Sequence, residues 1–203
     1  MFAYIRAPPG ADDKPAKEKT MSKTIVLLAD GLEECEGLTV VDLLRRAGAE
    51  VTTVSINGTK TITSSHSIIF QADETAENAD FDSADLLVLP GGLKGTDNLA
   101  ASPLVAEQCR RFAASKKLAA ICAAPGVLAG LGLLDGKRAT IHPACEDRMN
   151  SKITLTHESV TVDGNITTGN GLAASIAFGL ELVRQLEGEE AAAKVAKGIS
   201  LKL

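Results

Sequence analysis

The sequence contains no tryptophan, one tyrosine and five phenylalanines, so aromatic residues make up only 3% of its 203 positions. Hydrophobic residues nevertheless make up 45% of the chain. The core must therefore be built mainly from Ala, Val, Leu and Ile. Such a composition in a chain of this length is typical of a single α/β domain with a sizeable core.

Positive charge is also scarce, because 21 Lys and Arg residues are outnumbered by 26 Asp and Glu residues. The net charge is −5 and the isoelectric point about 5.3. Nucleic acids and anionic membrane surfaces both attract basic patches, so we expect neither as a partner. The sequence also has no apolar run long enough to span a bilayer.

No two cysteines are spaced as CxxC, which argues against a structural zinc site or a thioredoxin-type motif. A chain of this length does not need disulfides to fold. We therefore interpret all four cysteines as free thiols in the reducing cytoplasm. They are Cys35, Cys109, Cys122 and Cys145.

Residues 1–21 differ from the rest of the chain, since they carry prolines and mixed charges without hydrophobic periodicity. They lack the apolar segment of a secretory signal, and they contain acids that a transit peptide would usually lack. We interpret them as a flexible leader or an alternative start. Residues 22–203 are predicted to form one domain.

Short apolar runs alternate with helical patterns along this domain, which predicts a doubly wound, mostly parallel sheet. Ser102 followed by Pro103 predicts a helix N-terminus, and Gly48 predicts a helix end. Two later strands are predicted within 154–171, joined by a tight turn at Asp163-Gly164. Strands buried on both faces are predicted at 23–29, 85–92 and 117–122. Residues 57–73 are predicted to form a hairpin-rich excursion.

Four segments with reactive or small residues follow predicted strands. They are DGLEECEG (30–37), PGG (90–92), CAAP (122–125) and HP (142–143). Ligands of such sheets bind outside the carboxyl ends of the strands. The topology therefore predicts that these segments meet at one edge of the sheet and form an active site.

Cys122 is the candidate nucleophile at this edge, although free cysteine is among the most buried residue types and could simply fill space. A strand-to-helix turn presents a side chain at the sheet edge, and a helix N-terminus favours a thiolate. The small residues Ala123 and Ala124 allow close approach of a ligand. Gly91 and Gly92 could donate N–H groups to an oxyanion.

A thiolate nucleophile usually needs an acid/base partner. Among the histidines, His142 has the best position, whereas His66 lies in a polar hairpin and His157 on a half-exposed strand. Among the acids, Glu33 could be a helix N-terminal charge. Glu36 could be desolvated near the site and donate a proton. Periodicity does not choose between these two acids.

The motifs DGLEECE, RRAG, VLPGG, AAICAAP and IHP, in this order, resemble the ThiJ/PfpI superfamily over about residues 22–200. The similarity is to the branch of parkinsonism-associated deglycases and glyoxalase III enzymes. It implies a flavodoxin-like sandwich that forms a homodimer and uses no cofactor or metal. The residues that it implies are Cys122 as nucleophile, Glu36 as the acid, His142 beside the cysteine, and Gly91, Gly92 and Ala123 as backbone N–H donors.

Two departures from this resemblance affect the expected activity. Peptidase-type relatives carry a histidine directly after the nucleophile, where this chain has Ala123, which argues against proteolysis. The deglycase branch commonly has a GPGT-like turn where this chain reads TGNGLAAS (168–175). We expect Asn170 or Leu172 to reshape that side of the pocket.

The resemblance implies a glutathione-independent glyoxalase that converts methylglyoxal to lactate, with possible deglycase activity on early glycation adducts. The alternative is a redox-sensing, stress-protective chaperone in which Cys122 is oxidised to a sulfinate. Both functions use the same cysteine. The helix that contains Cys35 is the one that this family uses in its dimer interface.

Overall fold

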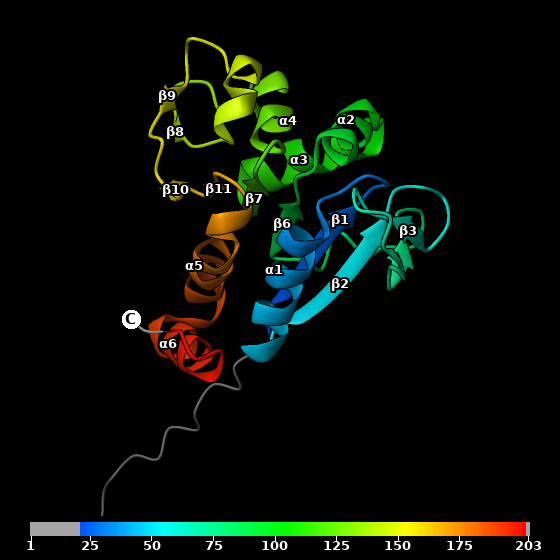
Figure 1. Ribbon diagram of the computed structural model, residues 1–203, viewed down its shortest axis with the longest axis vertical. Helices are drawn as coiled ribbons and strands as arrows, with labels where there is room; N and C mark the ends of the chain where they lie inside the picture. The colour runs from blue at the N-terminus through cyan, green and yellow to red at the C-terminus, as the bar shows by residue number, and fades with distance from the viewer. Residues whose placement is uncertain (1–20, 202–203) are drawn as a thin grey trace, which may run out of the picture.

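The computed structural model describes residues 21–201, so nearly all of the predicted leader lies outside the described residues. A seven-stranded sheet forms the centre, in the order β10-β11-β7-β6-β1-β2-β5 (Figure 1). Its strands are β1 (Lys23–Leu28), β2 (Glu50–Ser55), β5 (Glu74–Thr75), β6 (Leu86–Leu89), β7 (Lys117–Ile121), β10 (Val160–Asp163) and β11 (Ile166–Gly169). All neighbouring pairs are parallel except β10 with β11.

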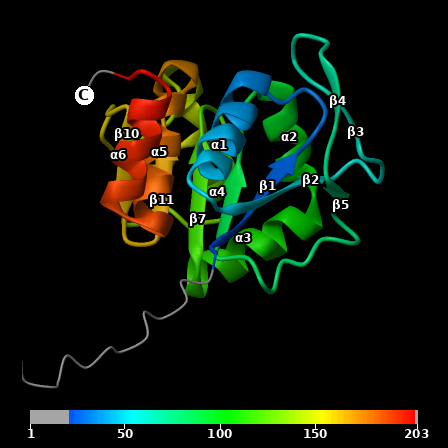
Figure 2. The same cartoon turned by 90° about the horizontal axis from the view of Figure 1, so that it is seen from below.

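Helices cover both faces of this sheet (Figure 2). One face carries α1 (Glu34–Arg46) and α5 (Ser175–Glu187), with α6 (Glu189–Gly198) packed on α5. The other carries α2 (Leu93–Ala101), α3 (Pro103–Ser115) and α4 (Pro125–Gly130). This arrangement confirms the predicted doubly wound, flavodoxin-like sandwich.

The core lies in two layers because side chains alternate across each strand. In β1, Ile25 and Leu27 pack under α2–α4, whereas Val26 and Leu28 pack under α1 and α5. Such a strand needs a continuous apolar sequence, which explains the pattern read from residues 23–29. On the face that carries α1 and α5, these two helices approach each other closely, since a Cβ at Gly179 would lie 2.6 Å from Cδ1 of Leu43.

Local sequence signals at the helix ends are also confirmed. The Ser102 hydroxyl accepts a hydrogen bond from the N–H of Val105, and Pro103 is the first residue of α3. Gly48 follows α1 with a φ of +89°, a conformation that favours glycine. All four cysteines are free thiols.

Three local predictions need correction. The turn between β10 and β11 consists of Gly164 and Asn165, because Asp163 already pairs with Ile166. The Asn165 amide is held there by three carbonyls near the end of α3. His157 lies outside any strand and has a φ of +57°.

The third correction concerns the strand expected directly before His142, which does not belong to the seven-stranded sheet. It contains β8 (Arg138–Ala139), which pairs with β9 (Thr154–Leu155) in a separate small sheet. The short helix η1 (Pro143–Arg148) follows His142.

The predicted hairpin is confirmed as β3 (Thr61–Thr63) and β4 (Ile69–Gln71). Within residues 21–201, no helix is both long and apolar enough to cross a membrane.

Candidate active site

Cys122 occupies the sharp turn between β7 and α4, at the carboxyl end of the strand. Its φ is +64°, a value that is uncommon for any residue other than glycine. Two hydrogen bonds hold this conformation. The Cys122 N–H donates to the carbonyl of Gly169 at 2.9 Å, and the Cys122 carbonyl accepts from the N–H of His142 at 2.9 Å. Neighbouring segments therefore hold a strained backbone that presents the thiol at the sheet edge.

The first turn of α1 places Glu36 opposite this thiol. Glu33 is the N-cap residue of the helix, and its Oε2 accepts a hydrogen bond from the N–H of Glu36 at 2.7 Å. The Glu36 residue is only 1% exposed. The Cys122 thiol and the Gly91 N–H lie beside its carboxyl, and its Oε2 has no hydrogen-bond partner among the described residues. The two acids that periodicity left open thus have different positions.

The Glu36 carboxyl and the Cys122 thiol both pack against the backbone of Gly91. A Cβ at this position would overlap Oε2 of Glu36 and Cβ of Cys122, and would lie 3.0 Å from the Cys122 sulfur. Gly92 has a φ of +87°, and a Cβ there would lie 2.5 Å from the Glu33 nitrogen. Both positions therefore require glycine for space, and Gly92 also for its backbone conformation.

The three predicted backbone donors lie at the site but face different groups. The N–H groups of Gly92 and Ala123 face the Cys122 sulfur, whereas that of Gly91 faces the Glu36 carboxyl. A negative charge can thus be stabilised at either member of the pair.

Burial raises the pKa of Glu36 to about 7. Burial, followed by the nearby Glu36 carboxylate, raises the pKa of Cys122 to about 12. The expected thiolate at a helix N-terminus therefore does not form independently of Glu36. Because each charge disfavours the other, the two groups titrate as a pair that holds one proton near and above neutral pH. A thiolate forms when that proton lies on Glu36.

His142 lies at the same edge but has another local role. Its Nδ1 accepts a hydrogen bond from the Ala144 N–H at 3.2 Å, so it is the N-cap residue of η1. Across residues 21–201, no hydrogen bond joins its ring to Cys122 or Glu36. Its ring contacts the turn before α5, since a Cβ at Gly171 would lie 3.1 Å from Cδ2.

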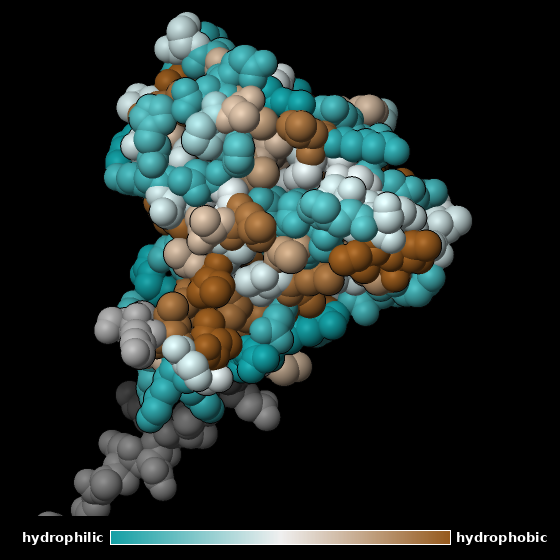
Figure 3. Space-filling view, viewed as in Figure 1, coloured by the Kyte–Doolittle hydropathy of each residue, from teal (hydrophilic) through white to brown (hydrophobic). Residues whose placement is uncertain are grey.

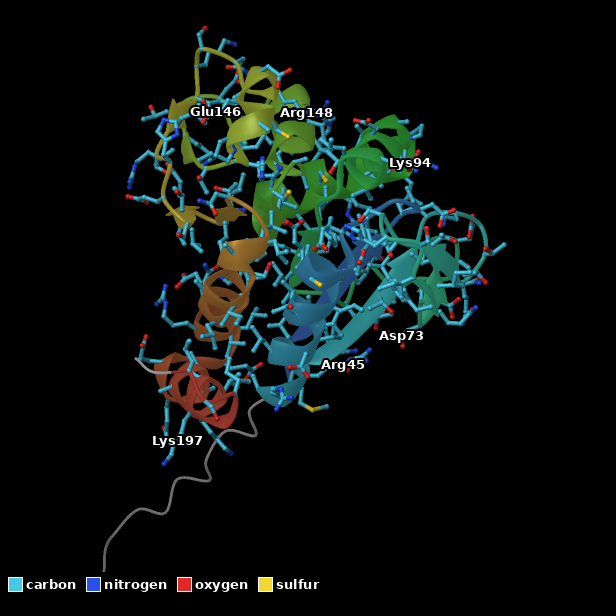
Figure 4. All side chains as sticks on the ribbon, in the orientation of Figure 1. Arg45, Asp73, Lys94, Glu146, Arg148 and Lys197 are labelled. Atoms are coloured by element: carbon cyan, nitrogen blue, oxygen red, sulfur yellow. The ribbon has the colours of Figure 1, made fainter. Side chains whose placement is uncertain are left out.

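A cavity of about 690 Å³ opens above Cys122. Besides Cys122 and His142, its walls include the β3–β4 hairpin, the start of α2 and the start of η1. Lys94, which Figure 4 labels on α2, belongs to this wall. Nothing in the sequence indicates that this predicted hairpin lines a cavity, because its hydroxyl side chains are ordinary for a surface loop. The lining residues missed by sequence reasoning are Thr63, Ser64, Ser65, Ser67, Leu93, Lys94, Ala144 and Cys145.

The expectation for the TGNGLAAS turn was wrong in its residues. Among the described residues, neither Asn170 nor Leu172 lines the cavity, and Leu172 is 52% exposed. Gly171 is the member of the turn nearest the site, between His142 and Glu36. Its φ is +139°, a backbone conformation that favours glycine.

A second cluster of polar groups lies outside this centre. Oxygens of Glu33 and Glu34 and a ring nitrogen of His66 lie within 4.8 Å of one another. His66 Nδ1 is 2.8 Å from Oε1 of Glu34, and Ser65 also bonds this carboxylate. These bonds tie the β3–β4 hairpin to α1 and account for the cluster.

The fold and the site together define a class of protein, an α/β sandwich with a cysteine in a strained strand-to-helix turn beside a buried carboxyl. The chain belongs to the DJ-1/PfpI family, whose pattern it matches over residues 22–185. It is 36% identical over 182 residues to protein dj-1beta of Drosophila melanogaster, covering 88% of this chain and 97% of that protein. It is 31% identical over 145 residues to a deglycase of Pyrococcus abyssi, covering 70% of this chain and 86% of that protein.

Solved structures agree with this assignment. The crystal structure of Drosophila DJ-1beta has a TM-score of 0.87 and 33% identity, covering 91% of this chain and 100% of that one. A structure of oxidized Toxoplasma gondii DJ-1 has a TM-score of 0.85 and 31% identity, covering 90% of this chain and 100% of that one.

Proposed function

We propose that this protein is a glutathione-independent glyoxalase with deglycase activity, and that Cys122 is its nucleophile. The observation that carries the proposal is the pairing of this thiol with Glu36, whose pKa is raised to about 7 at the base of a cavity. A general acid/base works best when its pKa lies near the operating pH. The similarity to a deglycase of Pyrococcus abyssi supports the same class of reaction.

The reaction starts when the Cys122 thiolate attacks the aldehyde carbon of methylglyoxal. The proton on Glu36 passes to the new alkoxide, which gives a hemithioacetal. The N–H groups of Gly92 and Ala123 stabilise the developing oxyanion. The Glu36 carboxylate then removes the hydrogen from the former aldehyde carbon and returns a proton to the neighbouring carbon through an enediol. Water hydrolyses the resulting thioester to lactate and restores the thiol.

Deglycation follows from the same first step. An early adduct of an amine with methylglyoxal presents a carbon at the aldehyde oxidation level, and attack by Cys122 releases the amine. The cavity of about 690 Å³ is larger than methylglyoxal requires. It therefore has space for the amine-bearing part of such an adduct.

The test measures lactate production from methylglyoxal by the purified protein, without glutathione or added metal. We expect lactate from the wild type and none from Cys122→Ser. Cys35→Ser is the matched control, because Cys35 is an exposed thiol outside the cavity. Absence of lactate from the wild type, or full activity of Cys122→Ser, overturns the proposal.

A redox-sensing, stress-protective chaperone is the second candidate. It is favoured by the backbone N–H groups and the carboxyl that surround the Cys122 sulfur, since both stabilise oxygen atoms added to it. The similarity to a Toxoplasma gondii protein solved in oxidized form supports it. Mass spectrometry after mild peroxide treatment is the test. Oxidation of Cys35, Cys109 or Cys145 before Cys122 contradicts this function.

We further propose that the protein acts as a homodimer in the cytoplasm. The face of α1 and α5 exposes large apolar side chains, including Leu38 and Ile176, and hydrophobic residues gather there (Figure 3). A second copy of the chain would remove these side chains from water. Four free thiols are typical of a reducing compartment.

A further inference from the structure

The active-site cavity contains a second thiol that the proposed reaction does not use. Cys145 lies in η1, is 3% exposed, and lines the same cavity as Cys122. The other two cysteines are placed differently: Cys109 is buried in the core, and Cys35 is exposed on α1. Neither of them lines this cavity.

The backbone holds the two cavity cysteines to a common residue. The His142 N–H donates to the Cys122 carbonyl at 2.9 Å, and the Cys145 N–H donates to the His142 carbonyl at 2.8 Å. The Cys145 side chain packs in a small cluster with Ala123, the residue that follows the nucleophile, and with Ile141. Cys145 is therefore the cysteine that the fold places next to the nucleophile's own turn.

We propose that Cys145 is the resolving thiol of Cys122, so that oxidation by hydrogen peroxide closes a disulfide between them. The Cys122 thiolate attacks one peroxide oxygen, and the O–O bond breaks to leave a sulfenic acid and hydroxide. The Cys145 sulfur then attacks the Cys122 sulfur, the S–O bond breaks, and water leaves with the Cys145 proton. This inference rests on the reactive Cys122 of the proposed function.

Closure requires η1 to move toward Cys122, because a disulfide holds its two Cβ atoms about 3.5–4.5 Å apart. The helix is a short 3-10 segment, whose hydrogen bonds are weaker than those of an α-helix. Its outer end is held by Arg148, which pairs with the exposed Asp97 at 2.9 Å. The disulfide would block the nucleophile reversibly and divert it from the irreversible sulfinate.

The experiment treats the reduced full-length protein with a small excess of hydrogen peroxide and follows intact mass, followed by non-reducing peptide mapping. We expect the wild type to lose the mass of two hydrogen atoms, to yield a linked Cys122–Cys145 peptide pair, and to regain its reduced mass with dithiothreitol. Cys145→Ala is expected to gain two oxygen atoms at Cys122 instead. Cys145→Ser serves as a second variant if the alanine protein does not fold.

Cys35→Ala and Cys109→Ala are the matched controls and should form the same linked pair as the wild type. A wild type that gains two oxygens at Cys122 at the rate of Cys145→Ala overturns the proposal. A Cys122 disulfide to Cys35 or Cys109 also overturns it. Lactate formation is measured separately on the reduced protein. A failure of the proposed enzyme activity is therefore distinguished from a failure of the disulfide between Cys122 and Cys145.

Discussion

The carboxyl group of Glu36 and the thiol of Cys122 meet over the backbone of Gly91. Burial raises the pKa of both groups, and the Glu36 carboxylate raises that of the Cys122 thiol further, so the pair carries two protons in acid and one near and above neutral pH. The cysteine is reactive only after the first of these protons has left. Its reactivity therefore depends on a residue that lies far from it in the sequence.

The pH dependence of the reaction follows from this pair. Below a pH of about 7 both groups are protonated, and no thiolate is available. We expect kcat/KM for methylglyoxal to rise with pH around a midpoint near 7, and to fall about tenfold per pH unit well below it. A profile that is flat between about pH 5.5 and 8.5 contradicts a shared proton.

The free energy of unfolding should also depend on pH through Glu36. The folded state keeps Glu36 protonated up to a pH of about 7, whereas the ordinary value is 4.5. The unfolded chain therefore binds fewer protons between these values, and stability falls as pH rises. We expect Glu36→Gln to raise the free energy of unfolding by about 3 kcal/mol at pH 8 and by less than about 1 kcal/mol at pH 5. Urea unfolding at the two pH values measures the difference, and equal gains at both contradict it.

Gly91 should not tolerate even a methyl group. Gly91→Ala places a Cβ onto the Glu36 carboxyl and Cys122, and the pair must separate. We expect a loss of lactate production of about a hundredfold or more, because small displacements at a reacting centre cost that much. Gly130→Ala is the control, since a Cβ there meets nothing within 4 Å. Similar kinetics for the two variants would show that the pair tolerates the displacement.

His142 is expected to contribute less than Glu36. Asparagine is a good N-cap residue, so His142→Asn should keep η1 and change stability little. A general acid/base typically contributes 10²–10⁴ in rate. We expect kcat/KM of His142→Asn to fall less than about tenfold, because its ring does not reach Cys122 or Glu36 by a hydrogen bond. A loss in the range of a general acid/base assigns the proton transfers to His142 instead.

The proposed dimer depends on the apolar face of α1. Leu38 is 40% exposed there, and a charge at this position would be desolvated in an interface. We expect Leu38→Asp to elute as a monomer in size-exclusion chromatography with light scattering, whereas the wild type elutes as a dimer. Val162→Asp is the control, since Val162 is 39% exposed on β10. A monomeric wild type removes the proposal.

The sequence was sufficient to predict the sandwich, because continuous apolar strands and capped helices are local signals. Residues 23–29 indicate a strand buried on both faces, and Ser102 with Pro103 indicates the start of α3. The strand-to-helix turn at Cys122 could be predicted for the same reason. The choice between Glu33 and Glu36 needed either the family resemblance or the structure, since it depends on which acid caps α1.

The rest of the site could not be predicted, because it is formed by contacts between distant segments. The β3–β4 hairpin becomes a cavity wall through its hydrogen bonds to α1 and to the loop that precedes α1. From the sequence, Cys145 is expected to be an ordinary core thiol. Only the structure shows that η1 brings it to the cavity that contains Cys122. The pKa of Cys122 depends on the buried Glu36, which a helix N-terminus alone does not reveal.

The close contact between Leu43 of α1 and Gly179 of α5 has a consequence for how these two helices can vary. A Cβ at position 179 would lie 2.6 Å from Cδ1 of Leu43, so a larger residue at 179 keeps this helix spacing only if residue 43 becomes smaller. We therefore expect substitutions at the two positions to occur together rather than singly in sequences that keep this packing.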